Sequence, residues 1–162
     1  MKNLSVFFVS TIIFFYTSFL HSYSSDPKNF IEELVNEAIN TLSNKDLNKD
    51  EKSKIIEKIA LENVDIDALG LYTLGELRKS SNTQDLLKYK VAFEKYFLKT
   101  LTSRLTDYSS SNFIIFDSDK KSSNYTIINS KIAPDNGDPE IKINWRVYTK
   151  NPEKPLIRDL IV

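Results

Sequence analysis

The spacing of apolar residues changes once along this chain, and that change limits the folds it can adopt. Between residues 83 and 108 apolar side chains recur every three or four positions, which predicts one wide stripe on a helix of about seven turns. The stripe consists of Leu86, Tyr89, Phe93, Tyr96, Phe97, Leu101, Leu105 and Tyr108. From residue 141 to residue 148 apolar and polar side chains alternate, as expected of a half-buried strand. The sequence therefore predicts helices first and then an antiparallel sheet on which they pack, an α+β fold in which the wide stripe must be covered.

Two helices are predicted before the long one. Asp26 and Pro27 supply a cap and a first-turn residue for a helix whose apolar face lies between residues 30 and 42. After a polar break, Asn48 and the acidic residues that follow it mark a second helix start. Both segments should therefore lie against the sheet with one face.

A shorter apolar segment lies between these helices and the long one. Residues 64–77 are apolar on most sides and predict a short helix buried between other elements. Gly70 and Gly75 each cost such a helix roughly 1 kcal/mol relative to Ala, and close packing is the simplest explanation for both. A loop is expected at residues 79–82, and Thr83 is expected to cap the long helix.

Four strands are predicted in the last third of the chain. They are expected at residues 113–116, 125–132, 140–148 and 156–162, with polar turns at residues 117–124, 134–139 and 151–155. No connection is long enough for a parallel crossover, so the strands should pair antiparallel with their neighbours in sequence.

The first 24 residues predict a secretory signal peptide. Lys2 precedes an almost wholly apolar run of about 15 residues, and Ser22 and Ser24 place small side chains three and one before a cleavage site. The run is short for a membrane-spanning helix, which needs roughly 20 residues, and no Cys follows to carry a lipid anchor. We therefore expect export and a single mature domain over residues 25–162, with a retained membrane anchor as the alternative.

Composition excludes several kinds of chemistry from the mature chain. The chain has no Cys, and its one His is His21. Catalytic triads based on His, thiolate nucleophiles, and zinc sites with Cys or His ligands are therefore excluded, and we expect no cofactor and no metal. Removal of Lys2 with the signal leaves 21 basic and 22 acidic side chains. This balance gives no reason to expect nucleic-acid binding, and no phosphate loop or dinucleotide motif is present.

Four stretches carry a family resemblance. They are Asp65, Ile66, Asp67, Leu69 and Gly70; Phe93, Tyr96, Phe97 and Leu98; Ile143, Asn144, Trp145 and Arg146; and Arg158, Asp159, Leu160, Ile161 and Val162. In this order and spacing, over essentially the whole mature chain, they resemble the MlaC family, the periplasmic phospholipid carriers also called toluene-tolerance auxiliary proteins. The individual motifs are hydrophobic patterns with a few fixed polar residues, so their order carries the resemblance.

The resemblance implies a fold and a function. It implies one domain in which a curved antiparallel sheet and flanking helices enclose an apolar cavity for lipid acyl chains, with the head group in water. The implied function is that of a monomeric periplasmic carrier, not an enzyme, which shuttles phospholipid between membranes and so maintains their lipid asymmetry. The implied partners are an inner-membrane ABC transporter complex and an outer-membrane lipoprotein/porin complex.

Two departures from the family pattern lie near the end of the chain. Family members commonly have an aromatic residue just before the last strand, where this chain has Pro155 and Leu156. They also continue with a Gly-Val-Ser-Leu-like segment and further helices beyond the position of Val162. We therefore expect the sequence to be incomplete at its C-terminus.

Ten apolar residues are candidates for the walls of an acyl-chain pocket. They are Leu69, Leu74, Phe93, Phe97 and Leu101 on the helices, and Ile127, Ile141, Ile143, Trp145 and Val147 on the strands. For any one of them alone, packing in an ordinary core is the preferred interpretation. For Trp145, a place at the cavity mouth with the indole N–H in water is equally consistent. Asp65 and Asp67 are interpreted as a helix cap in preference to a head-group contact.

Two other functions remain open at this point. An exported interaction domain with a filled core would show the same hydrophobic patterns. A small α+β hydrolase or isomerase would need a buried carboxylate of raised pKa, but most acidic residues lie at helix starts and in turns. Arg158 with Asp159 could be a partner-facing pair, although a solvated face is the preferred interpretation.

Overall fold

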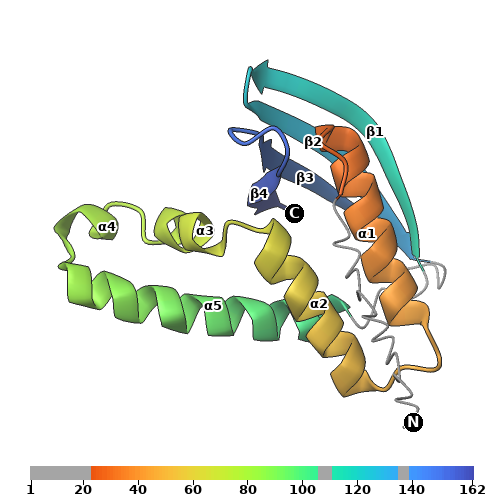
Figure 1. The fold of residues 1–162 in the computed structure, drawn as a ribbon, viewed down its shortest axis with the longest axis horizontal. Coiled ribbons are helices and arrows are strands. Elements are labelled where there is room, and N and C mark those ends of the chain that lie inside the picture. The colour runs from red at the N-terminus through yellow and green to blue at the C-terminus, as the bar shows by residue number, and fades with distance from the viewer. Residues whose placement is uncertain (1–22, 106–110, 135–138) are drawn as a thin grey trace, which may run out of the picture.

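The computed structural model describes residues 23–105, 111–134 and 139–162, and it places helices before strands (Figure 1). The helices are α1 Pro27–Ser43, α2 Lys49–Asn63, α3 Ile66–Thr73, α4 Leu77–Ser80 and α5 Thr83–Leu105. The strands are β1 Ser111–Ser122, β2 Tyr125–Pro134, β3 Ile141–Tyr148 and β4 Leu156–Ile161. Apart from Tyr23 and Ser24, the predicted signal peptide lies outside these ranges and stays a prediction. Within them, no helix is long and apolar enough to cross a bilayer.

The first two helices begin where the sequence predicts. The Asp26 side chain caps α1 by accepting hydrogen bonds from two backbone N–H groups, and Pro27 is the first helical residue. Asn48 caps α2, and the side chain of Glu51 accepts from the Asn48 backbone N–H at 2.9 Å, which completes a capping box. Side-chain caps therefore fix both starts locally.

The sheet is a four-stranded antiparallel meander in the order β1-β2-β3-β4, as predicted. Strand β1 is longer than expected, because residues 117–122, predicted as part of a polar turn, pair with the start of β2 instead. Only residues 123 and 124 remain in the turn. Since β1 is an edge strand, its polar side chains can reach water and do not need a turn to do so.

Helix α1 packs against the concave side of the curved sheet (Figure 1). Its Phe30 and Ile31 are at most 1% exposed, and they belong to one apolar cluster with Ile128, Val147 and Ile157 from three strands. The alternation predicted for β3 is confirmed, since every second residue from position 143 to position 147 is buried.

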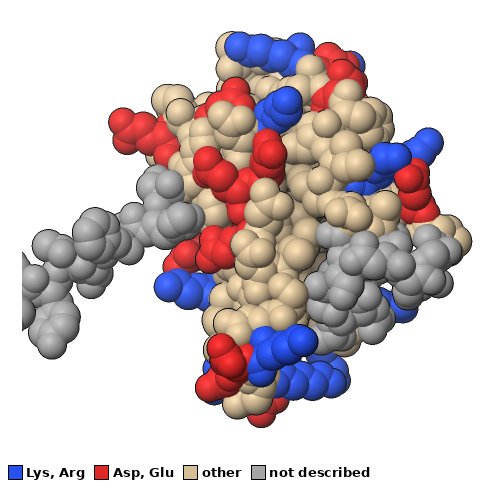
Figure 2. Space-filling view, turned by 90° about the vertical axis from the view of Figure 1, so that its right-hand side faces the viewer, with Lys and Arg blue, Asp and Glu red and all other residues tan. Residues whose placement is uncertain are grey.

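Both charge signs occur on the face shown in Figure 2, where basic side chains are dispersed and do not form one patch.

The long helix is placed differently from the prediction. Its cap is Asn82 and not Thr83, because the Asn82 side-chain oxygen accepts the backbone N–H of Asp85 at 2.9 Å. No residue of α5 is buried, and Val91 is 73% exposed. Figure 1 gives the reason: α5 runs away from the sheet, and α3 covers part of it. The expectation that the whole stripe is covered is therefore wrong, and Tyr108, at its end, lies outside the described residues.

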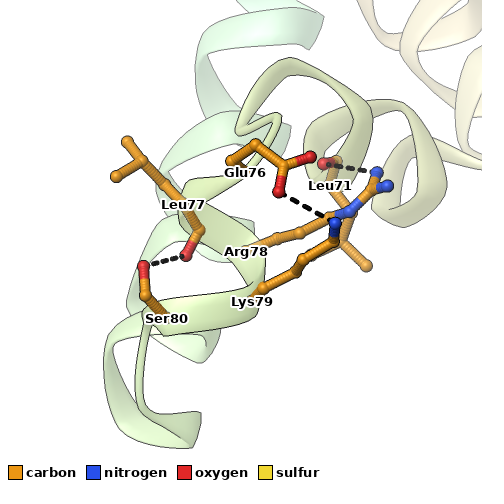
Figure 3. Close-up of polar contacts among 6 residues, drawn as sticks. All are labelled: Leu71, Glu76, Leu77, Arg78, Lys79 and Ser80. Carbon is orange, nitrogen blue, oxygen red and sulfur yellow. Dashed lines mark hydrogen bonds and ion pairs between the residues drawn. The ribbon is translucent and has the colours of Figure 1, made fainter.

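The segment between α2 and α5 forms two short helices rather than one buried helix. In α3 only Ile66 and Gly70 are buried, and Leu77 in α4 is 63% exposed. The break falls at Gly75, whose φ of +54° lies in the left-handed region that glycine favours. Local polar contacts hold α4, including an ion pair of 2.8 Å between Lys79 and Glu76 (Figure 3). Close packing therefore does not explain Gly75. The prediction of a loop at residues 79–82 is wrong for residues 79 and 80, which belong to α4.

Gly70 does mark a close approach between helices. A Cβ atom at this position would lie 2.8 Å from Cδ1 of Phe93 on α5. The ring of Phe93 also stacks on those of Tyr89 and Phe97, with centroids 5.8 Å and 6.2 Å away. The missing side chain of Gly70 therefore allows α3 to lie on the aromatic side of α5.

The unit formed by α3 and α5 is called the helical arm here, and Asp65 connects it to the sheet. Its backbone N–H donates to the carbonyl oxygen of Ile157 at 2.8 Å, which places the start of α3 beside β4. Its carboxylate accepts the backbone N–H of Ala68 at 3.1 Å, which confirms the predicted cap, and also Nε–H of Arg158 at 2.9 Å. One residue therefore ends the link from α2, starts α3 and binds the last strand.

We predict that the effect of Gly70→Ala on stability reverses with the residue at position 93. In the wild type the clash with the ring outweighs the helix propensity of Ala, and the free energy of unfolding should fall by about 1 kcal/mol. In a Phe93→Ala background the clash is absent, and the same substitution should raise it by up to about 1 kcal/mol. Urea unfolding of the four proteins measures both effects, and an equal effect in both backgrounds would contradict the proposed contact.

Candidate functional site

A cavity of about 220 Å³ lies between the inner face of the sheet and three helices. Helix α1 contributes Leu34, Ala38 and Leu42, α2 contributes Ile56 and Ala60, α5 contributes Phe97, Leu101 and Leu105, and the strands contribute Ile132, Ile143, Trp145, Ile157 and Leu160. Val162 also lines it. All residues that line the cavity are apolar or aromatic, so the space suits a hydrocarbon group and offers no charge to a polar one.

Trp145 presents only its apolar surface to this cavity. Its Nε1–H donates to Oγ of Ser130 at 2.7 Å, and the Ser130 hydroxyl donates in turn to the carbonyl oxygen of Ile143 at 3.2 Å. Trp145 and Ser130 are both buried. The alternative in which the indole N–H points into water is therefore wrong, because the polar atom is satisfied inside the protein.

The structure brings together four of the ten residues predicted to form the walls. Phe97 and Leu101 of α5 face Ile143 and Trp145 of β3 across the cavity. They come from elements about 40 residues apart in sequence, joined here because α5 and the inner face of the sheet border the same space. Their contact with lipid remains a prediction.

The other six predicted wall residues do not line the cavity. Val147 is fully buried in the core, and Ile141 is partly buried against it. Ile127 lies on the outer face of β2, where it pairs with Arg146, between the buried Thr126 and Ile128. Leu69, Leu74 and Phe93 are half-buried in the arm formed by α3 and α5.

The walls from α1 and α2 were not predicted as part of the site. Leu34, Ala38 and Leu42 recur every four residues along α1, which was interpreted only as the face of a helix on a sheet. That signal fixes which face turns inward. It does not say whether the facing side chains meet or leave space between them.

The sequence of the chain matches a family model described as MlaC protein over residues 32–162. The chain belongs to the MlaC family. A solved structure of a phospholipid-binding protein from Ralstonia solanacearum, in complex with a phospholipid, superposes with a TM-score of 0.68 and 12% sequence identity. The match covers 85% of this chain and 78% of that one. No curated protein matches the chain by sequence.

These findings confirm the family resemblance and the α+β fold expected from it. An MlaC-family chain was expected to have helices on a curved antiparallel sheet of about four strands, and α1, α2 and the β1-β2-β3-β4 meander form this arrangement. At 12% identity the solved structure supports the fold alone. No group of three or more His, Cys, Asp or Glu side chains that could hold a metal occurs among the residues that the structure describes.

We predict that the hydrogen bond behind the cavity wall stabilises this MlaC-family fold. Ser130→Ala leaves the buried indole N–H of Trp145 without an acceptor and should lower the free energy of unfolding by about 1–3 kcal/mol. Ser123→Ala, in the exposed turn between β1 and β2, is the matched control and should change it by less than about 0.5 kcal/mol. Thermal and urea unfolding measure both variants. Equal stability of the two would show that the buried bond contributes nothing.

Proposed function

We propose that this protein binds a phospholipid by one acyl chain in the apolar cavity and leaves the head group in water. The observation that carries the proposal is the cavity itself, whose walls offer apolar contacts from α1, α2, α5 and the sheet. Membership of the MlaC family supports the same ligand, and so does the phospholipid-bound protein of similar fold. Binding of this kind needs no catalytic group, and we propose a binding protein rather than an enzyme.

The size of the cavity limits how much lipid it takes as it stands. An apolar cavity of about 150 Å³ holds one benzene ring, so about 220 Å³ corresponds to roughly nine carbon atoms. At roughly 0.8 kcal/mol per methylene, these gain about 7 kcal/mol on leaving water. A bilayer offers a similar gain per methylene, so the protein has to resemble the membrane interior rather than surpass it. A longer chain requires a wider cavity.

Helix α5 is the wall best suited to move when a longer chain enters. It has no buried residue, and it packs mainly against α3 and α2 rather than against the sheet. By contrast, α1 holds Phe30 and Ile31 in the core. Displacing α5 therefore breaks fewer apolar contacts than displacing α1, and α5 carries the two predicted lipid contacts Phe97 and Leu101.

We propose that the bound lipid is carried through the periplasm. The predicted signal peptide supports export, and the family supports carriage between an inner-membrane ABC transporter complex and an outer-membrane lipoprotein/porin complex. Such traffic would maintain lipid asymmetry. The enzyme alternative finds no support at this site, because no side chain that lines the cavity carries a carboxylate.

We predict that filling the cavity removes lipid from the protein. Leu101→Trp places a larger side chain in the space that the acyl chain would occupy. Native mass spectrometry of the wild type, purified without detergent, should show a complex with one phospholipid, and the variant should lose at least about nine tenths of it, as expected for a penalty of 1.4 kcal/mol or more.

Val91→Trp is the matched control for this variant. Val91 lies on the same helix and is 73% exposed, so its replacement adds the same side chain without touching the cavity. It should keep as much lipid as the wild type. A lipid-free wild-type protein, or equal lipid in the two Trp variants, would contradict the proposed function.

A further inference from the structure

A second pocket, of about 240 Å³, lies on the outer face of the sheet, where α3 contacts β4, and residues of β2 and β3 also line it. Its polar lining consists of Tyr72, Tyr125, Tyr148, Arg146, Arg158 and Asp159. On β3 its residues alternate with the buried Trp145 and Val147, so it is separated from the acyl-chain cavity by the sheet. Its chemistry is the opposite of that of the cavity, with phenol and guanidinium groups in place of hydrocarbon.

A β-bulge in the last strand brings two consecutive charged residues to this pocket. Arg146 pairs with Asp159 and Val147 pairs with Ile157, so Arg158 is an extra residue in β4. In a regular strand consecutive side chains point to opposite faces, whereas here Arg158 and Asp159 both line the pocket. Bulges of this kind are common beside binding sites, because they redirect a side chain.

The two guanidinium groups have donors for which no acceptor is found among the residues that the structure describes. Nη1 of Arg146 lies 3.2 Å from Oδ2 of Asp159, but the buried Nε of Arg146 has no hydrogen-bond partner within the described parts of the chain. Arg158 donates from Nε to Asp65 and stacks on the ring of Tyr148 at 4.1 Å from its centroid. A buried guanidinium donor without a protein acceptor is rare in native proteins, so the Nε–H group of Arg146 is available to a ligand or to water.

We propose that this pocket binds a phosphate group. Guanidinium forks match phosphate oxygens, and the three oxygens of a phosphate can accept from Arg146, Arg158 and a phenol at the same time. The lining has two positive charges and one negative charge, and Asp65 lies 2.9 Å from Nε of Arg158, so the two arginines and the two carboxylates balance in charge. The attraction for phosphate therefore comes from the guanidinium N–H groups that are not engaged by these carboxylates, and the two carboxylates limit the affinity.

Tyr125 is placed to supply the phenol donor. It lies opposite Tyr148 at the start of β2 and lines the pocket. Its backbone is held by pairing with Tyr148, while its hydroxyl makes no hydrogen bond to another described residue. The phosphate can come from a free phosphate ester or from a lipid head group at a bilayer surface, and both present the same oxygens.

Two binding measurements on the purified protein test the site and separate these sources. The first is isothermal titration with inorganic phosphate, with chloride replaced so that ionic strength stays constant. The second is flotation with phosphatidylglycerol vesicles, compared with neutral phosphatidylcholine vesicles. Saturable binding of inorganic phosphate assigns the site to free phosphate groups, and binding to phosphatidylglycerol vesicles alone assigns it to lipid head groups.

Matched variants decide whether the pocket is responsible. Arg146→Met should weaken the binding about tenfold or more, and Arg146→Lys should also weaken it, because Lys keeps the charge but loses the fork. Lys142→Met is the control, since it removes a positive charge from the exposed face of the same strand without touching the pocket. Tyr125→Phe should weaken binding with little effect on folding. Leu101→Trp should leave phosphate binding unchanged, because Leu101 lines the other cavity.

The proposal is wrong if neither phosphate nor phosphatidylglycerol vesicles bind saturably. It is also wrong if Arg146→Met and Lys142→Met weaken binding equally, since that result would reflect net charge alone. If Arg146→Met fails to fold, unchanged binding by Tyr125→Phe together with Arg146→Lys would overturn the proposal in the same way.

Discussion

The structure depends on how much of the concave sheet face α1 covers. Where α1 lies on the sheet, Phe30 and Ile31 form a sealed core with Ile128, Val147 and Ile157. Further along α1, from Leu34 to Leu42, the inner side chains of β3 and β4 face α1, α2 and α5 across a space that they do not fill. Its apolar walls offer water no hydrogen bonds, and packing contacts stay unmade there unless hydrocarbon enters. The same sheet face is therefore core at one end and candidate binding site at the other.

The inner face of the sheet lines the apolar cavity, and the outer face lines the polar pocket. Asp65 connects the outer pocket to the helical arm. Ile157 and Leu160 face inward on β4, while Arg158 and Asp159 line the outer pocket. Asp65 binds Arg158 and caps α3, so it holds the helical arm at the edge of the sheet. Four polar residues of the family pattern, Asp65, Arg146, Arg158 and Asp159, form two ion pairs at this edge, so Arg158 and Asp159 each pair with another residue and not with each other.

The sequence predicts the elements of this protein better than it predicts the spaces between them. Asp26 and Asn48 predict helix starts because capping is a local effect. The alternation from Ile141 to Tyr148 predicts which face of β3 turns inward. The stripe on α5 also predicts a helix, but it cannot say that the helix leaves the sheet, because coverage depends on where α3 lies. For the same reason Leu34 and Ala38 were missed as cavity walls. Periodicity gives the direction of a side chain, and only the fold gives the distance to its neighbour.

The central claim is that hydrocarbon from a lipid enters the space beside Trp145, the only tryptophan in the chain. The most direct measurement is tryptophan fluorescence with phospholipids brominated on the acyl chain, since bromine quenches an indole only at close range. Brominated chains should quench Trp145 strongly, and the same lipid without bromine should not, with Leu101→Trp excluded because it adds a second indole. If the brominated lipid binds to the protein and leaves Trp145 unquenched, the acyl chain lies elsewhere and the cavity is not the carrier site.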